Sequence, residues 1–343
     1  MSENLKKEKS LKVPFSIPEI EGRPEEEILA KIVGEYPLVG EYQPTVIKQF
    51  RSGDGRVYNV FLIHINGERF DFFVAKGVAN EKTDIKLEWL ILKMLQDSKA
   101  FVPVLLIPEV QPENYMLVDF IEGQTAREAI EGGADKGEIF SKIGEALQTI
   151  HSVEAPKFGD LIEDNSQQWI DTVQQAFTKK MTNSADEVGA DILEKSIAFF
   201  NERKHLLEAD GQADPIIMHR DIYMENFILE KDTDYIFMID FGLGKGGRPL
   251  FDLAKFYIWD MYEDSDQQAN FLKTYSLYNP KDSEQVELLS LYILVELFGM
   301  IAYFKNSDKE LANHARGVLI DLLAGEGHIT DVLHAFLQQE QNG

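Results

Sequence analysis

The most constraining feature of this chain is a run of polar positions, residues 218–242, that short apolar segments separate from one another. Within it, Asn226 follows Asp221 by 5 residues, and Asp240 follows Asn226 by 14. The apolar segments that precede or separate these polar residues have the length of short strands: 216–217, 227–229 and 235–239. The pattern therefore predicts a strand–loop–strand unit that presents three polar side chains in a loop and at strand ends.

These three side chains are of the types that phosphoryl transfer from ATP requires. A carboxylate such as Asp221, held in a loop, can orient a hydroxyl group and accept its proton late in the transfer. The Asn226 amide oxygen and the Asp240 carboxylate suit Mg²⁺, a hard cation that keeps few protein ligands. We therefore predict Asp221 as the catalytic residue and Asn226 and Asp240 as metal ligands. His219, two positions before Asp221, is expected to brace the loop through hydrogen bonds.

A phosphate anchor has to come from elsewhere, because the chain has no Gly-x-x-x-x-Gly-Lys-[Ser/Thr] loop. Lys76 ends an apolar strand pattern, and Glu88, 12 residues later on an amphipathic helix, is placed to pair with it and fix its position. Glu81 is a competing partner, closer in sequence. Ser52 and Gly53 belong to a glycine-containing turn whose backbone N–H groups could cover phosphates, although an ordinary turn has the same composition.

The pattern changes along the chain in a way that predicts two lobes. Residues 1–40 are expected to form a polar arm and a helix. Residues 41–121 alternate like strands, carry an Asn-Gly hairpin signal at 66–67 and contain one helix at 83–96. Within them, 102–107 and 115–121 are predicted strands. Residues 122–343 are mostly helical, apart from the polar run and its flanking strands. We therefore predict an α+β fold with a small β-rich lobe and a larger helical lobe.

Composition narrows the classes of partner and compartment. The chain has 59 acidic and 34 basic residues, a formal net charge of -25, which repels nucleic acid and anionic membranes. It has no cysteine, so disulfides and cysteine-based metal sites are excluded. The apolar stretch 288–304 only reaches the lower length limit of a membrane span and contains Glu296, so a buried core helix is expected. We predict a cytoplasmic protein, monomeric or homodimeric, without nucleic-acid or membrane partners.

With these residues in place, the chain resembles the aminoglycoside phosphotransferase/choline kinase family of the protein-kinase-like superfamily. The resemblance covers roughly residues 45–320. The segments that carry it are Val74-Ala75-Lys76, Glu88, Tyr115–Gly123, Ile150-His151, Phe158–Asp160, the loop 219–226, Ile239–Gly242 and Asp252-Leu253-Ala254. It implies a bilobal kinase-like fold that binds ATP or GTP with Mg²⁺ between the lobes.

The resemblance also implies roles for residues that spacing alone does not assign. Lys76 would hold the α- and β-phosphates, and the Asp119 carbonyl and Ile121 amide would hold the adenine edge. Asp252 matches an aspartate at the start of a helix, which we expect to brace the catalytic loop.

The acceptor is the least constrained part of the prediction. Trp259, Asp260 and Glu263 lie in a region where family members commonly bind substrate, and they could attract an amine or stack on a sugar. An acidic helix end and ordinary aromatic packing would have the same composition. The expected acceptor is therefore a hydroxyl of a small molecule, for example an aminoglycoside or another amine or sugar.

One residue of the motif leaves a protein as an alternative acceptor. The family usually has Gly or Asn after the motif histidine, whereas Arg220 gives His-Arg-Asp, as in protein kinases. However, the 11 residues between Asp240 and Asp252 contain no Ser, Thr or Tyr, and no Ala-Pro-Glu follows them. A small-molecule kinase is therefore the leading hypothesis. A Ser/Thr protein kinase and a nucleotide-binding scaffold without catalysis are the alternatives.

Overall fold

The structure is a computed structural model in which contacts divide the chain into two compact units. The smaller unit consists of Met1–Thr83 with Pro112–Val118, and the larger of Asp84–Gln111 with Asp119–Gly343. The structure describes residues 25–50, 58–65, 72–78, 85–163, 167–262 and 264–325.

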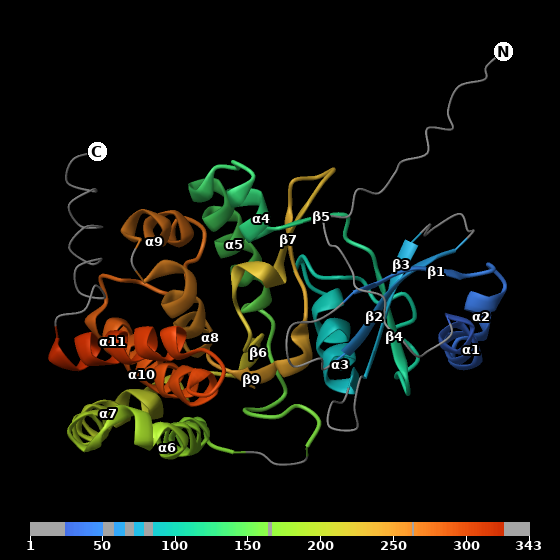
Figure 1. The fold of residues 1–343 in the computed structure, drawn as a ribbon. Coiled ribbons are helices and arrows are strands. Elements are labelled where there is room, and N and C mark those ends of the chain that lie inside the picture. Colours follow the sequence, from blue (N-terminus) through green and yellow to red (C-terminus); the bar gives the residue numbers. More distant parts are fainter. Residues whose placement is uncertain are drawn as a thin grey trace. The chain divides into compact units, whose positions relative to one another are not determined.

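The smaller unit is built on one sheet whose strand order is β1–β2–β3–β4. Its elements are α1 (Glu25–Glu35), α2 (Pro37–Gly40), β1 (Thr45–Phe50), β2 (Tyr58–His64), β3 (Phe72–Val78) and β4 (Tyr115–Asp119). Strand β2 pairs antiparallel with both β1 and β3, and Val60 lies opposite Lys76. The hairpin predicted around residues 66–67 is thus confirmed in its strand pairing (Figure 1).

Helix α1 is tied to the edge of this sheet by its last residues. The Glu35 carboxylate accepts hydrogen bonds from the backbone N–H groups of Asn114 (2.9 Å) and Tyr115 (3.3 Å). The Tyr36 hydroxyl, which is buried, donates to the Tyr115 carbonyl at 2.8 Å. The N-terminal helix is therefore an integral part of the smaller unit.

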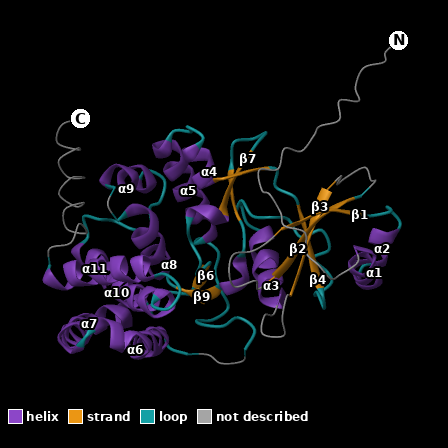
Figure 2. Cartoon of the chain, viewed as in Figure 1, coloured by secondary structure: helices purple, strands orange, loops and turns teal. Residues whose placement is uncertain are grey.

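The larger unit is mostly helical and contains two small antiparallel sheets (Figure 2). Its helices are α3 (Ile85–Gln96), α4 (Ala126–Glu131), α5 (Lys136–Ile150), α6 (Trp169–Val188), α7 (Ala190–Asp210), α8 (Pro249–Phe256), α9 (Ser265–Leu272), α10 (Ser283–Phe304) and α11 (Lys309–Ala324). The sheets pair β5 (Gly123–Thr125), β7 (Phe227–Glu230) and β8 (Ile236–Met238) in the order β5–β7–β8, and β6 (Ile216–Met218) with β9 (Lys245–Gly247).

Helix α10 packs against α6, α7, α8 and α11 in the larger unit (Figure 1). Of the described residues, α10 has the length and apolar composition of a membrane span, and 72% of its most apolar window is buried inside the protein. The expected buried core helix is therefore confirmed.

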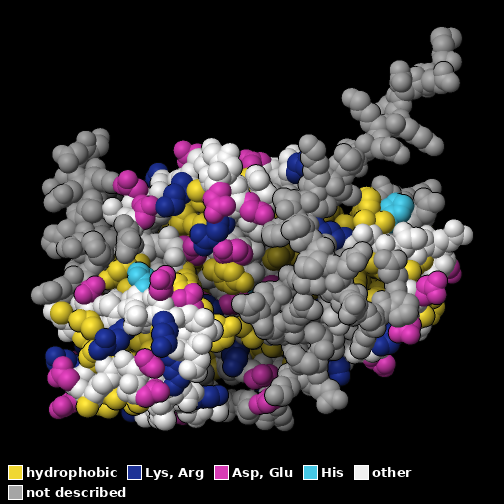
Figure 3. All heavy atoms as spheres, viewed as in Figure 1, with side chains coloured by type: hydrophobic (Ala, Val, Ile, Leu, Met, Phe, Trp, Pro, Cys, Tyr) yellow, Lys and Arg dark blue, Asp and Glu magenta, His cyan; other side chains and the backbone are white. Residues whose placement is uncertain are grey.

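Several of the acidic residues cap the N-termini of helices. Carboxylate side chains of Asp135, Asp264, Asp282 and Asp308 accept hydrogen bonds from the first backbone N–H groups of α5, α9, α10 and α11. Such caps satisfy N–H groups that have no partner inside the helix. On the face shown in Figure 3, acidic and basic side chains are interspersed over the larger unit.

One sequence expectation needs correction. Residues 102–107 form no strand, and Leu105 makes only an isolated bridge. Pro103 has no N–H to donate to a ladder, and the Val104 N–H is bonded instead to the Asp119 carboxylate at 2.6 Å. Beyond Phe256, helix α8 continues as a π-helix, Tyr257–Met261, a rare form that is often associated with functional sites.

Candidate active site

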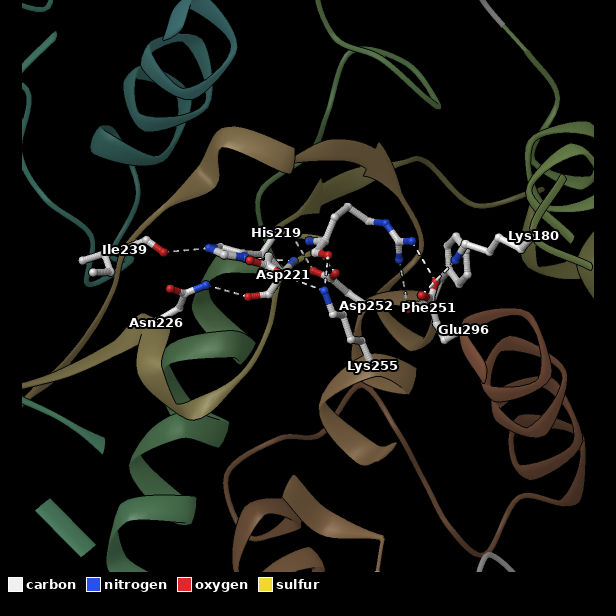
Figure 4. Close-up of polar contacts among 10 residues, drawn as sticks. Lys180, His219, Asp221, Asn226, Ile239, Phe251, Asp252, Lys255 and Glu296 are labelled. Carbon is white, nitrogen blue, oxygen red and sulfur yellow. Dashed lines mark hydrogen bonds and ion pairs between the residues drawn. The ribbon is translucent and has the colours of Figure 1, made fainter. Parts of the chain in front are cut away.

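The polar run of the sequence forms one hydrogen-bonded loop between β6, β7 and β8. The backbone N–H of Ile239, which follows β8, donates to the Asn226 carbonyl at 2.9 Å. The Asn226 side-chain Nδ2 donates in turn to the Asp221 carbonyl at 2.8 Å. These bonds bring Asp221, Asn226 and the start of the Ile239–Asp240 segment together within the larger unit (Figure 4).

His219 joins the two halves of this loop. Its Nε2 lies 2.8 Å from the Ile239 carbonyl, and its Nδ1 lies 3.2 Å from the backbone N of Asp221. A carbonyl can only accept and a backbone N–H can only donate, so the ring carries its proton on Nε2 and is neutral. Burial lowers the pKa of His219, which favours this neutral form. The geometry is that of a brace and supports the predicted role.

Asp252, on α8, holds the loop from the opposite side. Its fully buried carboxylate accepts the backbone N–H groups of His219 (2.6 Å) and Arg220 (2.8 Å). The His151 Nε2 lies 3.2 Å from the same carboxylate, and the Tyr275 hydroxyl lies 2.7 Å from His151 Nδ1. Burial opposes ionisation, but the His151 hydrogen bond and the Arg220 charge hold the pKa of Asp252 below its ordinary value.

Arg220 is neutralised from within the fold. Its guanidinium lies 2.7 Å from Glu296 Oε1 and stacks over the Phe251 ring at 4.0 Å. The Lys180 ammonium lies 2.9 Å from the other Glu296 oxygen. Burial opposes the charge on Glu296, yet Lys180 and Arg220 lower the pKa of Glu296 to about 2. The single carboxylate in the middle of α10 thus pairs with two cations, one from α6 and one from the loop.

Two residues of the loop region adopt the left-handed backbone conformation that L-residues avoid. Arg220 has φ 67°, and Asp240 has φ 70° just before the 3₁₀ turn Phe241–Leu243. Such conformations cost on the order of 1–3 kcal/mol and cluster at functional sites.

Burial raises the pKa of Tyr223 to about 12, and the charges of Asp221 and Asp240 raise it in the same direction. The two carboxylates therefore act on one small region.

The donor set at this region fits Mg²⁺. Asn226 uses its Nδ2 to bond the Asp221 carbonyl, which leaves the amide oxygen as the atom for a cation. Asp240 adds a carboxylate, and both are hard oxygen donors. Among the described residues no group of three or more His, Asp or Glu side chains has metal-binding geometry. The protein ligands would therefore be Asn226 and Asp240, completed by water or phosphate oxygens.

The predicted nucleotide-binding residues divide between the units. Lys76 lies on β3 in the smaller unit and is 8% exposed, whereas Glu88 lies on α3 in the larger unit and is 3% exposed. Their pairing stays a prediction. Asp119 ends β4, where burial raises the pKa of its carboxyl group to about 6, and Ile121 follows two residues later. Ser52 and Gly53 lie outside the described residues.

Asp260, one of the predicted acceptor residues, lies in the π-helix with its side chain 2% exposed. Its Oδ1 lies 3.2 Å from the Arg127 guanidinium of α4, which also pairs with Glu225 of the loop 219–226. In the described part of the chain, the buried Asp260 Oδ2 has no hydrogen-bond partner. Burial, opposed by the Arg127 charge, raises the pKa of Asp260 to about 6.

The other residues near the π-helix have different surroundings. The half-buried Trp259 packs edge-on against Phe304 of α10, with ring centroids 5.5 Å apart. Asp264 caps α9 and pairs with Lys136 at 2.8 Å, so its carboxylate already has a structural use. Glu263 lies outside the described residues.

Sequence reasoning missed Lys255, which contacts the predicted catalytic residue. Its ammonium, carried on the last turn of α8, lies 2.5 Å from Asp221 Oδ1 and 3.4 Å from the Arg220 carbonyl (Figure 4). The two side chains are 34 residues apart in sequence, so spacing gave no signal. A lysine three positions after Asp252 on the same helix was the available hint.

The comparisons with known proteins identify the family of the chain and its fold. A sequence model of the phosphotransferase enzyme family, APH, matches residues 52–289, and the chain belongs to this family. No curated protein matches the sequence significantly.

Solved structures share the fold at low sequence identity. An ethanolamine kinase of Plasmodium vivax is 12% identical, with 89% of each chain covered and a TM-score of 0.60. A thermostable mutant of aminoglycoside phosphotransferase APH(4)-Ia, in ternary complex with AMP-PNP and hygromycin B, is 14% identical; 87% of this chain and 98% of that chain are covered, with a TM-score of 0.61. A choline kinase of Streptococcus pneumoniae is 15% identical, covers 88% and 99%, and has a TM-score of 0.55. The predicted α+β, kinase-like fold is confirmed.

Proposed function

We propose that this protein transfers the γ-phosphoryl group of ATP or GTP to a hydroxyl of a small molecule. The observation that carries the proposal is the hydrogen-bonded loop: His219 and Asn226 bond the backbone of Asp221, and the Asn226 carbonyl accepts the N–H of Ile239, the residue before Asp240. Family membership supports the reaction type, and similar structures in complex with AMP-PNP or ADP support a nucleotide donor.

The proposed step follows from these positions. Asp221 orients the acceptor hydroxyl and receives its proton as the oxygen–phosphorus bond forms and the bond between the β,γ-bridging oxygen and the γ-phosphorus breaks. Nucleoside diphosphate leaves with the electrons of the broken bond. Mg²⁺, held by Asn226 and Asp240, would neutralise charge on the phosphates. Lys76 would hold the α- and β-phosphates, supported by Glu88, and Asp119 and Ile121 would hold the base.

A small-molecule acceptor is favoured over a protein by the segment after Asp240. Strand β9 pairs with β6, and a Cβ added at Gly246 would meet the Lys157 carbonyl oxygen at 1.8 Å. This close packing leaves position 246 no room for a side chain. Arg220 is already neutralised by Glu296, so the loop does not depend on an added phosphate for its counter-charge.

A screen for nucleotide consumption tests the proposal. The purified protein is incubated with Mg²⁺, ATP or GTP, and aminoglycosides, macrolides, choline, amino alcohols, sugars or generic protein substrates. We expect acceptor-dependent turnover with one small-molecule class. Transfer only to protein would favour the kinase alternative, and stabilisation by nucleotide without turnover would favour a scaffold.

We expect Asp240→Asn to raise by at least about tenfold the Mg²⁺ concentration that gives half-maximal turnover, because it removes the charged ligand of the pair. Titration of Mg²⁺ at saturating nucleotide measures this. Asp234→Asn is the matched control, because Asp234 shares the left-handed backbone (φ 63°) but pairs with Lys142 on the surface. An unchanged Mg²⁺ dependence in Asp240→Asn would remove Asp240 from the metal site.

We further propose that Asp260 takes part in binding an amine of the acceptor, together with Trp259 and Glu263. The raised pKa of Asp260, about 6, gives this proposal a pH signature. Asp260 gains a proton as the pH falls through 6, so KM for an amine-bearing acceptor should rise there while KM for nucleotide does not. In Asp260→Asn, KM should be high and flat over pH 5 to 8. An unchanged acceptor KM in this variant would contradict the assignment.

A further inference from the structure

We propose that Lys255 is the positioning residue of the catalytic carboxylate, holding Asp221 Oδ1 so that Oδ2 faces the acceptor. This inference rests on the proposed function. It assigns to α8 a part of the catalytic machinery that the loop itself does not contain.

The contact is specific to one carboxylate oxygen. The Lys255 ammonium lies 2.5 Å from Asp221 Oδ1 (Figure 4), and both side chains are about one-fifth exposed, at 21% and 23%. In the described part of the chain, Asp221 Oδ2 has no protein partner. A carboxylate with one oxygen fixed by a cation has a single remaining oxygen for a hydroxyl group.

The fold also holds Lys255 in place. Its Nζ lies 3.4 Å from the Arg220 carbonyl, so the ammonium bridges the backbone and the side chain of adjacent loop residues. Asp252, three residues earlier on α8, binds the same loop through two N–H groups. One helix therefore positions both the loop backbone and the catalytic carboxylate.

Charge gives the contact a second consequence. The loop from Asp221 to Asn226 reads Asp-Ile-Tyr-Met-Glu-Asn and carries no lysine or arginine of its own. A phosphoryl group approaching Asp221 meets like charge, and like charges at close range repel strongly in a partly buried site. Lys255 offsets this repulsion from the other oxygen of the same carboxylate, Oδ1.

A double-mutant cycle tests the inference, using ATP and an acceptor identified in the screen. We expect Lys255→Met to lower kcat by about 10- to 100-fold, with KM for ATP within twofold, because a misoriented carboxylate costs rate more than affinity. Lys255→Arg keeps the charge and should recover at least part of the loss. Lys273→Met, at an exposed lysine that directly follows α9, is the matched control and should keep full activity.

The decisive comparison is made in the Asp221→Asn background, with single-turnover measurements at excess enzyme. If Lys255 acts through Asp221, adding Lys255→Met there should produce no further loss. An equal loss in both backgrounds, or a kcat within twofold of wild type in Lys255→Met, would overturn the inference. Full turnover in Asp221→Asn alone would instead overturn the proposed function, so the two failures are distinguishable.

Discussion

Asp221→Asn is expected to lower the rate of phosphoryl transfer by about 10²–10⁴-fold, because an amide cannot receive the acceptor proton. The backbone groups of residue 221 keep their partners, since the N–H lies by His219 and the carbonyl by Asn226. The loop should therefore stay folded. Single-turnover assays with saturating nucleotide measure the rate, and thermal shift with ATP and Mg²⁺ measures nucleotide binding, which we expect to persist.

The control for this variant is Asp232→Asn, an exposed aspartate in the turn between β7 and β8. It should leave both rate and binding unchanged. A rate within threefold of wild type for Asp221→Asn would show that the acceptor proton goes elsewhere. Loss of the thermal shift would show instead that the carboxylate supports nucleotide binding.

Glu296→Gln is expected to lower the free energy of unfolding by about 3–5 kcal/mol, because it leaves the charges of Arg220 and Lys180 without their buried partner. The Glu296 side chain is 8% exposed, so solvent cannot replace the lost charge. Urea denaturation at pH 7 measures the effect. Glu287→Gln on the same helix is the matched control: its pair with Arg203 is half exposed, and the expected loss is under about 1 kcal/mol.

The effect of Glu296→Gln should also depend on pH. The folded pKa of Glu296 is about 2, below an unfolded value of about 4.3. A lowered carboxyl pKa stabilises the fold above the unfolded value, and this contribution is lost as the pH falls toward the folded value. The difference in stability between wild type and Glu296→Gln should therefore shrink between pH 4.5 and 2. A difference that stays constant over this range would contradict the ion-pair explanation.

The parts of the fold that follow local rules could be predicted from sequence. Helix α10 begins and ends where the apolar pattern and the Asp282 cap place it. The loop around Asp221 was recognisable because its polar residues lie close together in the chain, between strands. The expected strand at 102–107 was wrong because Pro103 breaks the ladder, which an apolar count does not register.

The contacts that complete the site join residues far apart in the sequence, so residue spacing does not predict them. Lys255 meets Asp221 only because α8 packs beneath the loop, and Glu296 meets Arg220 across 76 residues. The sequence does show Glu296 as a charged residue inside an otherwise apolar helix, and a buried charge requires a partner. Nothing local identifies that partner. The Arg127–Asp260 pair, 133 residues apart, is equally invisible.

The π-helix after α8 has a consequence for how the acceptor preference of this protein can evolve. One additional residue in a helical turn rotates everything beyond it by about 100° about the axis, while residues before it keep their direction. Asp252 and Lys255 precede the π-helix, whereas Trp259 and Asp260 lie within it. The two residues that bind the loop and the two proposed acceptor residues thus lie on consecutive parts of one helical segment. The direction of the second part can change while the first part stays in place. We expect substitutions of Trp259 or Asp260 to change the proposed acceptor contacts while Asp252 and Lys255 keep their contacts with the loop around Asp221.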